Sequence, residues 1–545
     1  ILSCLLAVFS VVQVVGVRWV RDLVFIHGVS VGFYPTLGYV AATIFPYALL
    51  VGFVLPYSLL VARLRSADYP GNWVYMADNA GDVAGAAVFS LLLVHWLTPF
   101  QVLLAIHLPL LGSLWQLRSG FSCRTVAAGM LAIVVLMAGA VFEDQLLPTR
   151  EGRRILYAEG RYGRIEVVES GGQISFFTDG APSLASHDPA LAEESVHFPL
   201  SQIDTHRRVL LVSAVGGMTA EIAKYHPERV DYLELDALAA RLKLKFGLMS
   251  SMEGLTVVTK DARAYLSGTS TRYDAILVNL PEPETYQVNR FFTAEFFELV
   301  KNHLFPGGVF SFAIDGVANY ISETRQHKLS SLANTARSRF DHVTLMPGQR
   351  LFFLCRDQPI RTDIPLLLEK RGIDTRHIRR YFVGDLTDQR IGQLNDAVDA
   401  SIPQNLDLSP RLMQLAFSGW FGRHGESPLG FSLLLAIAAM MYLLKISRPQ
   451  WVLLTTGCVS IGAEMLAIFT FQMLYGYIYI QLGVLVTVFL AGMLPGAWLG
   501  GQFAGNHRRA MVGADLLLCL LLLLFALVLL CVRQIMPAWL LYGFG

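Results

Sequence analysis

Apolar residues occur in long unbroken runs at both ends of the chain, and a central stretch of mixed polarity separates the two sets. Each run is close to the roughly 20 residues that cross a hydrocarbon core. The pattern predicts about five membrane helices at the N-terminal end and about four at the C-terminal end, with residues 75–82 as a polar link. The predicted spans lie near 1–17, 37–62, 83–97, 100–116, 124–142, 429–445, 450–471, 478–503 and 514–533.

The central stretch has the periodicity of a soluble α/β protein. Residues 154–179 alternate around a Gly-Gly pair, which indicates short antiparallel strands. From residue 205 strand and helix patterns alternate and end in a hairpin at 341–355, which predicts a mostly parallel sheet with helices on both faces. The predicted regions are N-terminal transmembrane helices at 1–142, a small β subdomain at 143–204, a Rossmann-like domain at 205–358, a helical extension at 359–425 and C-terminal transmembrane helices at 426–545.

Composition narrows the class of protein. Hydrophobic residues make up 54% and charged residues 16%, too apolar for an ordinary soluble protein of this size. The net charge of +1 lacks the basic excess of a nucleic-acid binder. The 6 cysteines show no CxxC spacing, and the histidines at 197, 206 and 226 lack ligand spacing, so no metal site is predicted.

Loop charges predict an orientation for the spans. Arg63, Arg118, Lys445 and Arg508 fall in loops on one side, with further basic residues beside them, whereas the links at 98–99 and 473–477 carry no charge. The positive-inside rule makes the basic side cytoplasmic and places the central domain in a periplasm-like space, at the inner membrane of a bacterium. Basic residues at 18, 21 and 533 disagree with this orientation. Because Ile1 begins inside an apolar run, we take this start to be internal to a longer protein.

The stretch from Arg208 to Asp236 has the order of a nucleotide-binding βαβ unit. The apolar run at 209–212 is typical of a buried parallel strand. Gly216 and Gly217 follow where the backbone must turn sharply. Glu234 ends the second strand about 20 residues later, where an acid usually holds ribose hydroxyls.

Further motifs along the central stretch resemble spermidine synthase, the aminopropyltransferase with a Rossmann-like methyltransferase fold. They are RYGRIEVVESGGQISFFTDG (161–180), EESVHFPL (193–200), VLLVSAVGG (209–217), YLELD (232–236), KDARAYL (260–266), YDAILVNLPEP (273–283) and FFTAEFFELVKNHLFPGGVFSFAID (291–315). With the flanking spans, the whole chain is similar to the membrane-fused spermidine synthase-like proteins of bacteria.

The resemblance implies a set of cofactor-binding residues. In spermidine synthase the cofactor is decarboxylated S-adenosylmethionine and the acceptor is putrescine. Glu234 matches the acid that binds the ribose, and Asp261 and Ala262 match the pair that contacts adenine. Gly216 and Gly217 match the end of the glycine run. A decarboxylated S-adenosylmethionine or S-adenosylmethionine cofactor is therefore the expectation if a nucleotide still binds.

The residues that carry out the family's chemistry are mostly replaced. The family's glycine run contains an acid, whereas residues 213–217 contain none. Asn279 stands where the family has the carboxylate that takes a proton from the amine, and an amide is no general base near neutral pH. Glu282 matches the second acid of that segment. The Tyr-Gln pair of the acceptor loop falls on Leu191 and Ala192.

Three other features have alternative interpretations. Arg290, before a helix start, is expected to form a structural salt bridge, with anion binding as the alternative. Glu464 lies within a predicted span and should face the helix bundle with a polar partner, in a structural clamp or in a proton or substrate path. Glycines between 483 and 500 recur at roughly helical spacing, which favours close helix packing.

The sequence leaves two main functional hypotheses. The first is a non-catalytic membrane subunit, whose degenerate spermidine synthase-like domain docks other protein subunits or forms a homo-oligomer. The second is an active aminopropyl- or methyltransferase in which Glu234 and Asp261 hold the cofactor and Glu282 handles the amine. A transporter is a weaker third hypothesis. Membrane lipid is an expected partner, and nucleic acid is not.

Overall fold

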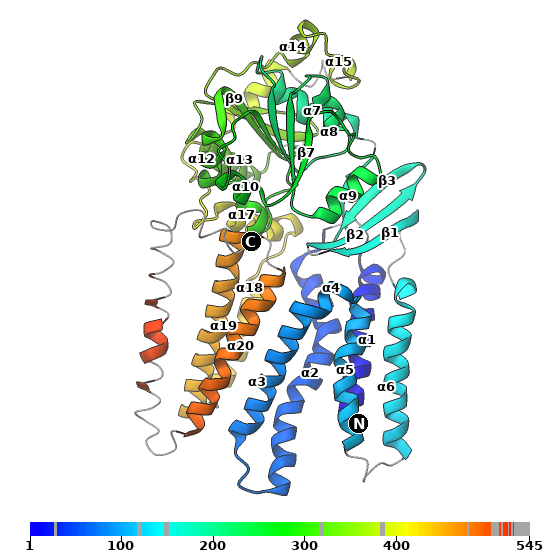
Figure 1. Ribbon diagram of the computed structural model, residues 1–545. Helices are drawn as coiled ribbons and strands as arrows, with labels where there is room; N and C mark the ends of the chain where they lie inside the picture. The colour runs from blue at the N-terminus through cyan, green and yellow to red at the C-terminus, as the bar shows by residue number, and fades with distance from the viewer. Residues whose placement is uncertain are drawn as a thin grey trace. The chain divides into compact units, whose positions relative to one another are not determined.

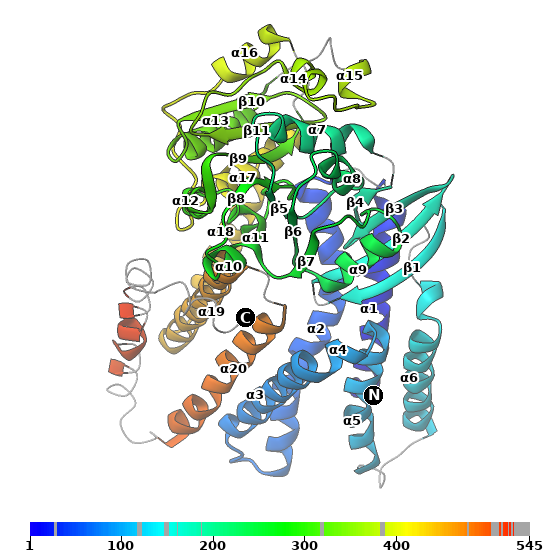
Figure 2. The same cartoon turned by 45° about the horizontal axis from the view of Figure 1, so that its top comes forward.

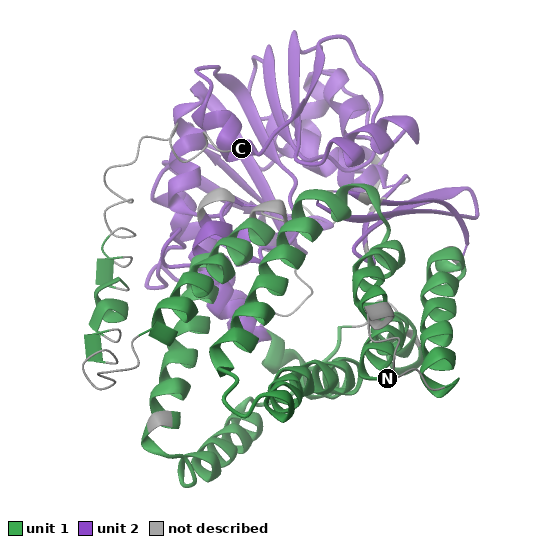
Figure 3. Cartoon of the chain, turned by 60° about the horizontal axis from the view of Figure 1, so that its bottom comes forward, with its two compact units in different colours: residues 1–149, 420–468, 478–534 green, residues 150–419, 469–477, 535–545 purple. Residues whose placement is uncertain are grey.

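The computed structural model describes residues 1–26, 30–116, 123–146, 152–160, 162–186, 188–316, 321–381, 387–476 and 479–502, with short pieces between 512 and 527. The chain forms two compact units, coloured separately in Figure 3. The first unit comprises residues 1–149, 420–468 and 478–534, and the second comprises 150–419, 469–477 and 535–545. Figure 1 labels the elements of both.

The first unit is built of helices. By length and composition, six helices among the described residues can cross a membrane, and the pair α17 (Arg411–His424) and α18, bent by 106°, would add a seventh. The predicted span at 514–533 lies largely outside the described residues. The helices are α1 (Leu2–Val24), α2 (Phe33–Arg65), α3 (Gly71–Val88), a π-helical turn (Phe89–Leu93), α4 (Val94–Trp96), α5 (Pro99–Gln116), α6 (Cys123–Val141), a 3₁₀ turn (Glu143–Leu146), α18 (Leu429–Leu443), α19 (Arg448–Tyr475) and α20 (Tyr479–Gln502).

The prediction of a link at residues 75–82 is wrong, because these residues lie inside helix α3. Asn79 is buried there, and its side chain donates a hydrogen bond to the carbonyl of Tyr75, one turn earlier, at 2.8 Å. The polar side chains that suggested a loop are thus accommodated within a continuous helix.

Helices α3 and α20 pack closely through small residues. A Cβ at Gly483 of α20 would lie 1.8 Å from Oγ of Ser90, in the π-helical turn that follows α3, and one at Gly501 would lie 2.2 Å from Nδ2 of Asn72 in α3. Gly492, Gly496 and Gly500 have open space instead. Close helix packing at glycine is therefore confirmed at Gly483 but does not extend along the whole predicted stripe.

Arg18, one of the basic residues that disagrees with the predicted orientation, has an acidic neighbour. Its guanidinium lies 3.8 Å from the carboxylate of Glu143, and both side chains are largely buried. Its charge is thus partly compensated within the protein, which weakens its bearing on a rule based on loop charges.

The second unit contains two sheets. The smaller is an antiparallel meander in the order β1-β2-β3-β4, as the alternating pattern at 154–179 indicates. The larger has seven strands in the order β10-β11-β9-β8-β5-β6-β7, parallel from β9 through β7, with β11 and β10 antiparallel. Their bounds are β1 (Arg153–Gly160), β2 (Gly163–Ser170), β3 (Gln173–Thr178), β4 (Ala181–Ala185), β5 (Arg208–Val212), β6 (Arg229–Glu234), β7 (Leu255–Thr259), β8 (Tyr273–Val278), β9 (Leu304–Asp315), β10 (His342–Met346) and β11 (Arg350–Arg356).

The larger sheet is buried on both faces, as its continuous apolar strands predict. Alternate residues of β5 enter different cores: Val209 and Leu211 pack in one, and Leu210 and Val212 pack in the other. The helices that pack with this sheet are α7 (Pro189–Leu200), α8 (Met218–Ala223), α9 (Ala237–Lys245), α10 (Ala262–Ser267), α11 (Tyr286–Asn289), α12 (Ala294–Asn302) and α13 (Glu323–Arg337). Figure 2 shows the sheet between these helices. The mostly parallel sheet and the final hairpin are therefore confirmed.

Helix α7 belongs with the larger sheet, although the boundary expected at residue 204 groups it with the small one. Its buried residues Ala192 and Val196 lie in the same core as Val209. The small sheet ends at Ala185, the last residue of β4. The extension after β11 comprises α14 (Ile364–Lys370), α15 (Ile378–Tyr381), α16 (Asp388–Asp396) and α17.

Candidate functional site

The candidate site lies at the carboxyl edge of the larger sheet, where the parallel strands end. Gly216 and Gly217 follow β5, Glu234 is the last residue of β6, Asp261 follows β7 and Asn279 follows β8. Parallel α/β sheets bind ligands along this edge. The structure therefore brings the predicted residues to one edge of the domain.

The glycine turn after β5 is tightly packed against the protein itself. Gly217 has φ +93°, a left-handed conformation that favours glycine. A Cβ at Gly216 would lie 2.8 Å from the carbonyl oxygen of Ala185, at the end of β4. The close approach that glycine permits at position 216 is thus made by the chain's own backbone.

Glu234 belongs to a buried network of polar side chains. Its Oε2 accepts a hydrogen bond from the hydroxyl of Tyr232 at 2.5 Å and from Nζ of Lys243, on α9, at 2.5 Å. The side chains of Lys243 and Glu234 are 7% and 12% exposed. Among the described residues, the hydrogen bonds to this carboxylate go to Oε2 and none goes to Oε1.

Asp261 has two structural contacts. It is the N-cap of α10, where its Oδ1 accepts the backbone N–H of Ala264 at 3.0 Å. Both of its oxygens also accept hydrogen bonds from the guanidinium of Arg290, at 3.1 and 3.3 Å. The salt bridge predicted for Arg290 is therefore present. Ala262, the other residue of the predicted adenine pair, is the first residue of α10 and is buried.

Asn279 is positioned by its main chain, while part of its side chain lacks a partner. Its backbone N–H donates to the carbonyl of Val212 at 2.9 Å. Its side-chain Nδ2 is buried without a hydrogen-bond acceptor among the described residues. An orphaned donor of this kind costs about 1–3 kcal/mol, and a bound ligand with an acceptor atom would satisfy it.

Glu282 links the segment after β8 to the end of β9 and to helix α13. One carboxylate oxygen accepts the backbone N–H of Asp315 at 2.8 Å, and the other pairs with the ammonium of Lys328 on α13. Burial alone would raise the pKa of Glu282, but the charge and hydrogen bond of Lys328 hold it below its usual value. Glu282 therefore stays ionised near neutral pH, with both oxygens engaged in the fold.

Asp315 is a site residue that sequence reasoning missed. It ends β9, directly opposite Arg350 of β11 in the antiparallel register, and its side chain reaches solvent. Desolvation and the nearby Glu282 carboxylate raise the pKa of Asp315 above its usual value. The available signal was an acid directly after the buried strand at 309–314 of a predicted parallel sheet.

The positions of the family's acceptor loop hold apolar side chains. Ala192 is buried, and its Cβ lies 3.4 Å from the position of a Cβ built on Gly217. Leu191 packs against the same core. The next residue, Glu193, is also buried and accepts the backbone N–H groups of residues 376–378 at the start of α15. This segment therefore organises the fold around the site.

In the first unit, Glu464 is half-buried in α19. The part of the chain that the structure describes gives it no hydrogen bond and no ion pair. The polar partner expected for Glu464 thus stays a prediction.

Comparisons with known proteins find a matching family model and similar curated proteins. The family model described as spermine/spermidine synthase domain matches residues 189–347. A polyamine aminopropyltransferase from Oceanobacillus iheyensis is 30% identical over 258 residues, covering 43% of this chain and 50% of that protein. One from Mycobacterium tuberculosis is 26% identical over 273 residues, covering 46% of this chain and 50% of that protein. The chain thus spans about half the length of these relatives.

Among solved structures, the spermidine synthase from Thermotoga maritima is 18% identical, with a TM-score of 0.37, and covers 44% of this chain and 88% of that chain. The family-model match at residues 189–347 runs from α7 to β10 and covers six of the seven strands of the larger sheet, all but β11. The chain therefore carries a spermidine synthase-like domain with the Rossmann-like methyltransferase fold.

Proposed function

We propose that this domain is a transferase that moves an alkyl group, most simply aminopropyl, from an S-adenosylmethionine-type nucleotide to an amine. The observation that supports it most directly is the pair of carboxylates at the ends of β8 and β9. The pKa of Glu282 is lowered and that of Asp315 is raised, although the two groups are neighbours. Carboxylates whose environments separate their pKa values in this way are typical of acid–base sites.

The residues on the other side of the edge suit the nucleotide. Oε1 of Glu234 would accept the ribose hydroxyls, and residues 261–262 at the start of α10 would contact adenine. The sulfonium of such a nucleotide supplies an activated alkyl carbon, and its sulfur leaves as a thioether with the electron pair of the broken C–S bond. The protein's own task is then to hold the amine and accept its proton.

Asp315 takes the role of general base that the resemblance assigns to the position of Asn279. As the amine nitrogen bonds to the alkyl carbon, its surplus proton passes to the carboxylate of Asp315. A raised pKa suits this step, because a base works best when its pKa approaches the working pH. Glu282, engaged on both oxygens, positions Asp315 by accepting its backbone N–H.

The proposal is tested by nucleotide binding to the purified full chain in detergent. We expect calorimetry to show binding of decarboxylated S-adenosylmethionine and Glu234→Gln to raise Kd about 10- to 100-fold, the value of a hydrogen bond to a charged group. Glu228→Gln, at an exposed position just before β6, serves as the control and leaves Kd unchanged. Transfer is then followed by mass spectrometry with amines as acceptors. If the chain binds neither decarboxylated S-adenosylmethionine nor S-adenosylmethionine, the proposal is refuted. If it transfers only a methyl group, the donor is S-adenosylmethionine instead.

A second candidate function, a non-catalytic docking subunit, is favoured by specific contacts. Three acids that the resemblance places in the site are each paired with an internal cation: Glu234 with Lys243, Asp261 with Arg290 and Glu282 with Lys328. On this proposal the domain assembles other subunits or a second copy of the chain. Co-purification of stoichiometric partner proteins, together with failure to bind a nucleotide, would support it.

For both functions we propose that the apolar helices anchor the chain in the inner membrane of a bacterium, with the domain on the periplasmic side. The support is the distribution of basic residues in the loops. A single cysteine at Glu228, in a chain without other cysteines, should react with an impermeant maleimide in intact spheroplasts. Labelling only after lysis would place the domain in the cytoplasm.

A further inference from the structure

Helix α13 presents two cations to the end of β9. Arg325 lies in the first turn of this helix, and Lys328 follows three residues later, so their side chains are neighbours on the helix surface. Further along, buried apolar residues of α13 pack in the same core as residues of β9, among them Leu329 with Phe312. The helix that carries both cations is therefore packed against the strand that ends in Asp315.

Arg325 binds the main chain at the end of β9. Its Nη2 donates hydrogen bonds to the carbonyl oxygen of Asp315 and, at 3.0 Å, to that of Gly316. The backbone N–H of Asp315 donates in turn to Oε2 of Glu282 at 2.8 Å. Both polar groups of the Asp315 main chain are thus held by side chains, which restricts the direction in which its own carboxylate projects.

Lys328 acts through Glu282. Its ammonium pairs with the other oxygen of that carboxylate, and the side chains of Lys328 and Glu282 are 11% and 12% exposed. A carboxylate that accepts a main-chain N–H at one oxygen and an ammonium at the other has little freedom to rotate. Lys328 therefore holds Glu282 in the orientation in which it binds Asp315.

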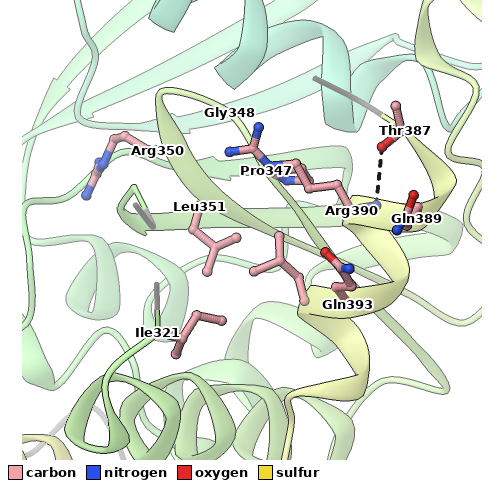
Figure 4. A pocket seen from close by; sticks show the side chains of 10 residues that line it. Ile321, Pro347, Gly348, Arg350, Leu351, Thr387, Gln389, Arg390 and Gln393 are labelled. Atoms are coloured by element: carbon pink, nitrogen blue, oxygen red, sulfur yellow. Dashed lines mark hydrogen bonds between the residues drawn. The ribbon is translucent and has the colours of Figure 1, made fainter. Parts of the chain in front are cut away.

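Arg350, on β11, is a further cation at this edge of the sheet. It lines a cavity of about 340 Å³, but in Figure 4 its guanidinium points away from that cavity. The guanidinium donates instead to the carbonyl of Leu280, in the segment after β8, at 3.1 Å. The cavity wall at Gly348 packs against a buried carboxylate, that of Glu194. Arg350 thus supports the edge of the sheet and not a ligand in the cavity.

We infer that Arg325 and Lys328 are positioning residues for the transfer reaction, which hold the main chain of Asp315 and its neighbour Glu282 so that the Asp315 carboxylate faces the acceptor amine. This inference rests on the proposed transferase function and names the residues that orient its general base. Both cations act through other residues and not on the reacting atoms. Because a displacement of about 1 Å can cost about 10²-fold in rate, we expect them to affect kcat more than the binding of the amine.

The same cations act on the ionisation of Asp315. Desolvation and the Glu282 carboxylate raise the pKa of Asp315. The charges that lower this pKa are those of Arg350, Arg325 and Lys328. Loss of the charge at Arg325 should therefore raise the pKa further. Since Asp315 must be ionised to accept a proton, the acidic limb of the kcat profile should then move to higher pH, which a substitution that only loosens the fold does not predict.

The experiment measures steady-state transfer by the purified full chain from decarboxylated S-adenosylmethionine to 1,4-diaminobutane, or from S-adenosylmethionine if only that nucleotide binds. We expect Arg325→Gln and Lys328→Met each to lower kcat about 10- to 100-fold, with KM for the amine little changed. Arg325→Gln should also move the acidic limb to higher pH. Arg325→Lys keeps the charge but not the fork of N–H donors, so it should restore the limb and only part of kcat.

The control is Arg337→Gln, which removes an exposed arginine in the last turn of the same helix and should change neither kcat nor the limb. Thermal midpoints in detergent show whether each variant folds. Unchanged transfer in Arg325→Gln, or an acidic limb that stays in place, overturns the inference and leaves the transferase proposal unaffected. If the wild type transfers nothing, the transferase is refuted instead. The pKa of Asp315, read from the pH dependence of the thermal midpoint against Asp315→Asn, then still decides whether Arg325 controls that carboxylate.

Discussion

The two halves of the sheet's carboxyl edge differ in which of the family's acidic residues they retain. In the half formed by β5, β6 and β7, the acids at 234 and 261 stand where a nucleotide-binding domain needs them, but each has an internal cation. In the half formed by β8, β9 and β11, the expected carboxylate is an amide, yet a different acid, Asp315, lies at the edge. An acid that is kept at the family's position therefore does not show that the nucleotide still binds there. Equally, the loss of the family's carboxylate at Asn279 does not show that transfer is lost.

The largest effect should come from the β8–β9 half. Asp315→Asn removes the proposed base, so we expect kcat to fall about 10²- to 10⁴-fold, the usual contribution of general base catalysis. Wild-type activity should fall as pH drops through the raised pKa of Asp315, because the base must be ionised, and this acidic limb should lie above the ordinary Asp value of 3.8. Asp341→Asn, at an exposed acid before β10, is the control. If Asp315→Asn leaves the activity unchanged, Asp315 is not the general base.

In the half of the edge formed by β5, β6 and β7, the pair of Glu234 and Lys243 is tested by its contribution to the free energy of unfolding. Lys243→Met leaves the buried Glu234 carboxylate without its cation, and we expect a loss of about 3–5 kcal/mol in the free energy of unfolding, as for other broken buried pairs. Thermal unfolding in detergent measures it. The double variant Glu234→Gln with Lys243→Met should recover much of the loss, because no unpaired charge remains. If Lys243→Met alone is neutral, the pair is not a structural element of this half.

The smallest effect is expected at the residue that first suggested inactivity. Asn279→Asp places a carboxylate at the family's position, but if Asp315 is the base, transfer to any acceptor should change by less than about tenfold. Steady-state rates with a panel of amines as acceptors, 1,4-diaminobutane among them, measure this. Transfer that appears only in Asn279→Asp would show that the native chain lacks a base and would favour the docking function.

The arrangement of strands was predictable because buried strands and helices repeat their apolar residues at fixed spacings. Continuous apolar runs predicted the parallel strands, and the order of strands and helices predicted the sheet. The same logic failed at residues 75–82, where acidic and amide side chains suggested a loop although the backbone remains helical. A hydropathy pattern records the polar side chain of Asn79 but not its hydrogen bond to the carbonyl one turn earlier in the same helix.

The pairings that decide the site's charge were not predictable. Lys243 is an ordinary lysine in an amphipathic helix by sequence, and only the fold shows that its ammonium reaches Glu234 across the sheet edge. Lys328 and Glu282 are joined by a long-range contact that no local spacing encodes. Asp315 could have been found, because an acid at the end of a buried parallel strand must lie at the edge where ligands bind.

The packing of α3 against α20 has a consequence for biosynthesis. Asn72 contacts a glycine at position 501, so α3 acquires this neighbour only after roughly 400 further residues have been made. At about 5–20 residues per second, that delay is on the order of 20 to 80 seconds. During this interval α3, with the amide of Asn79 and the acid of Asp78, exists without its final neighbour. The second unit, with its two sheets, has time to fold first, and the helices of the first unit are completed last.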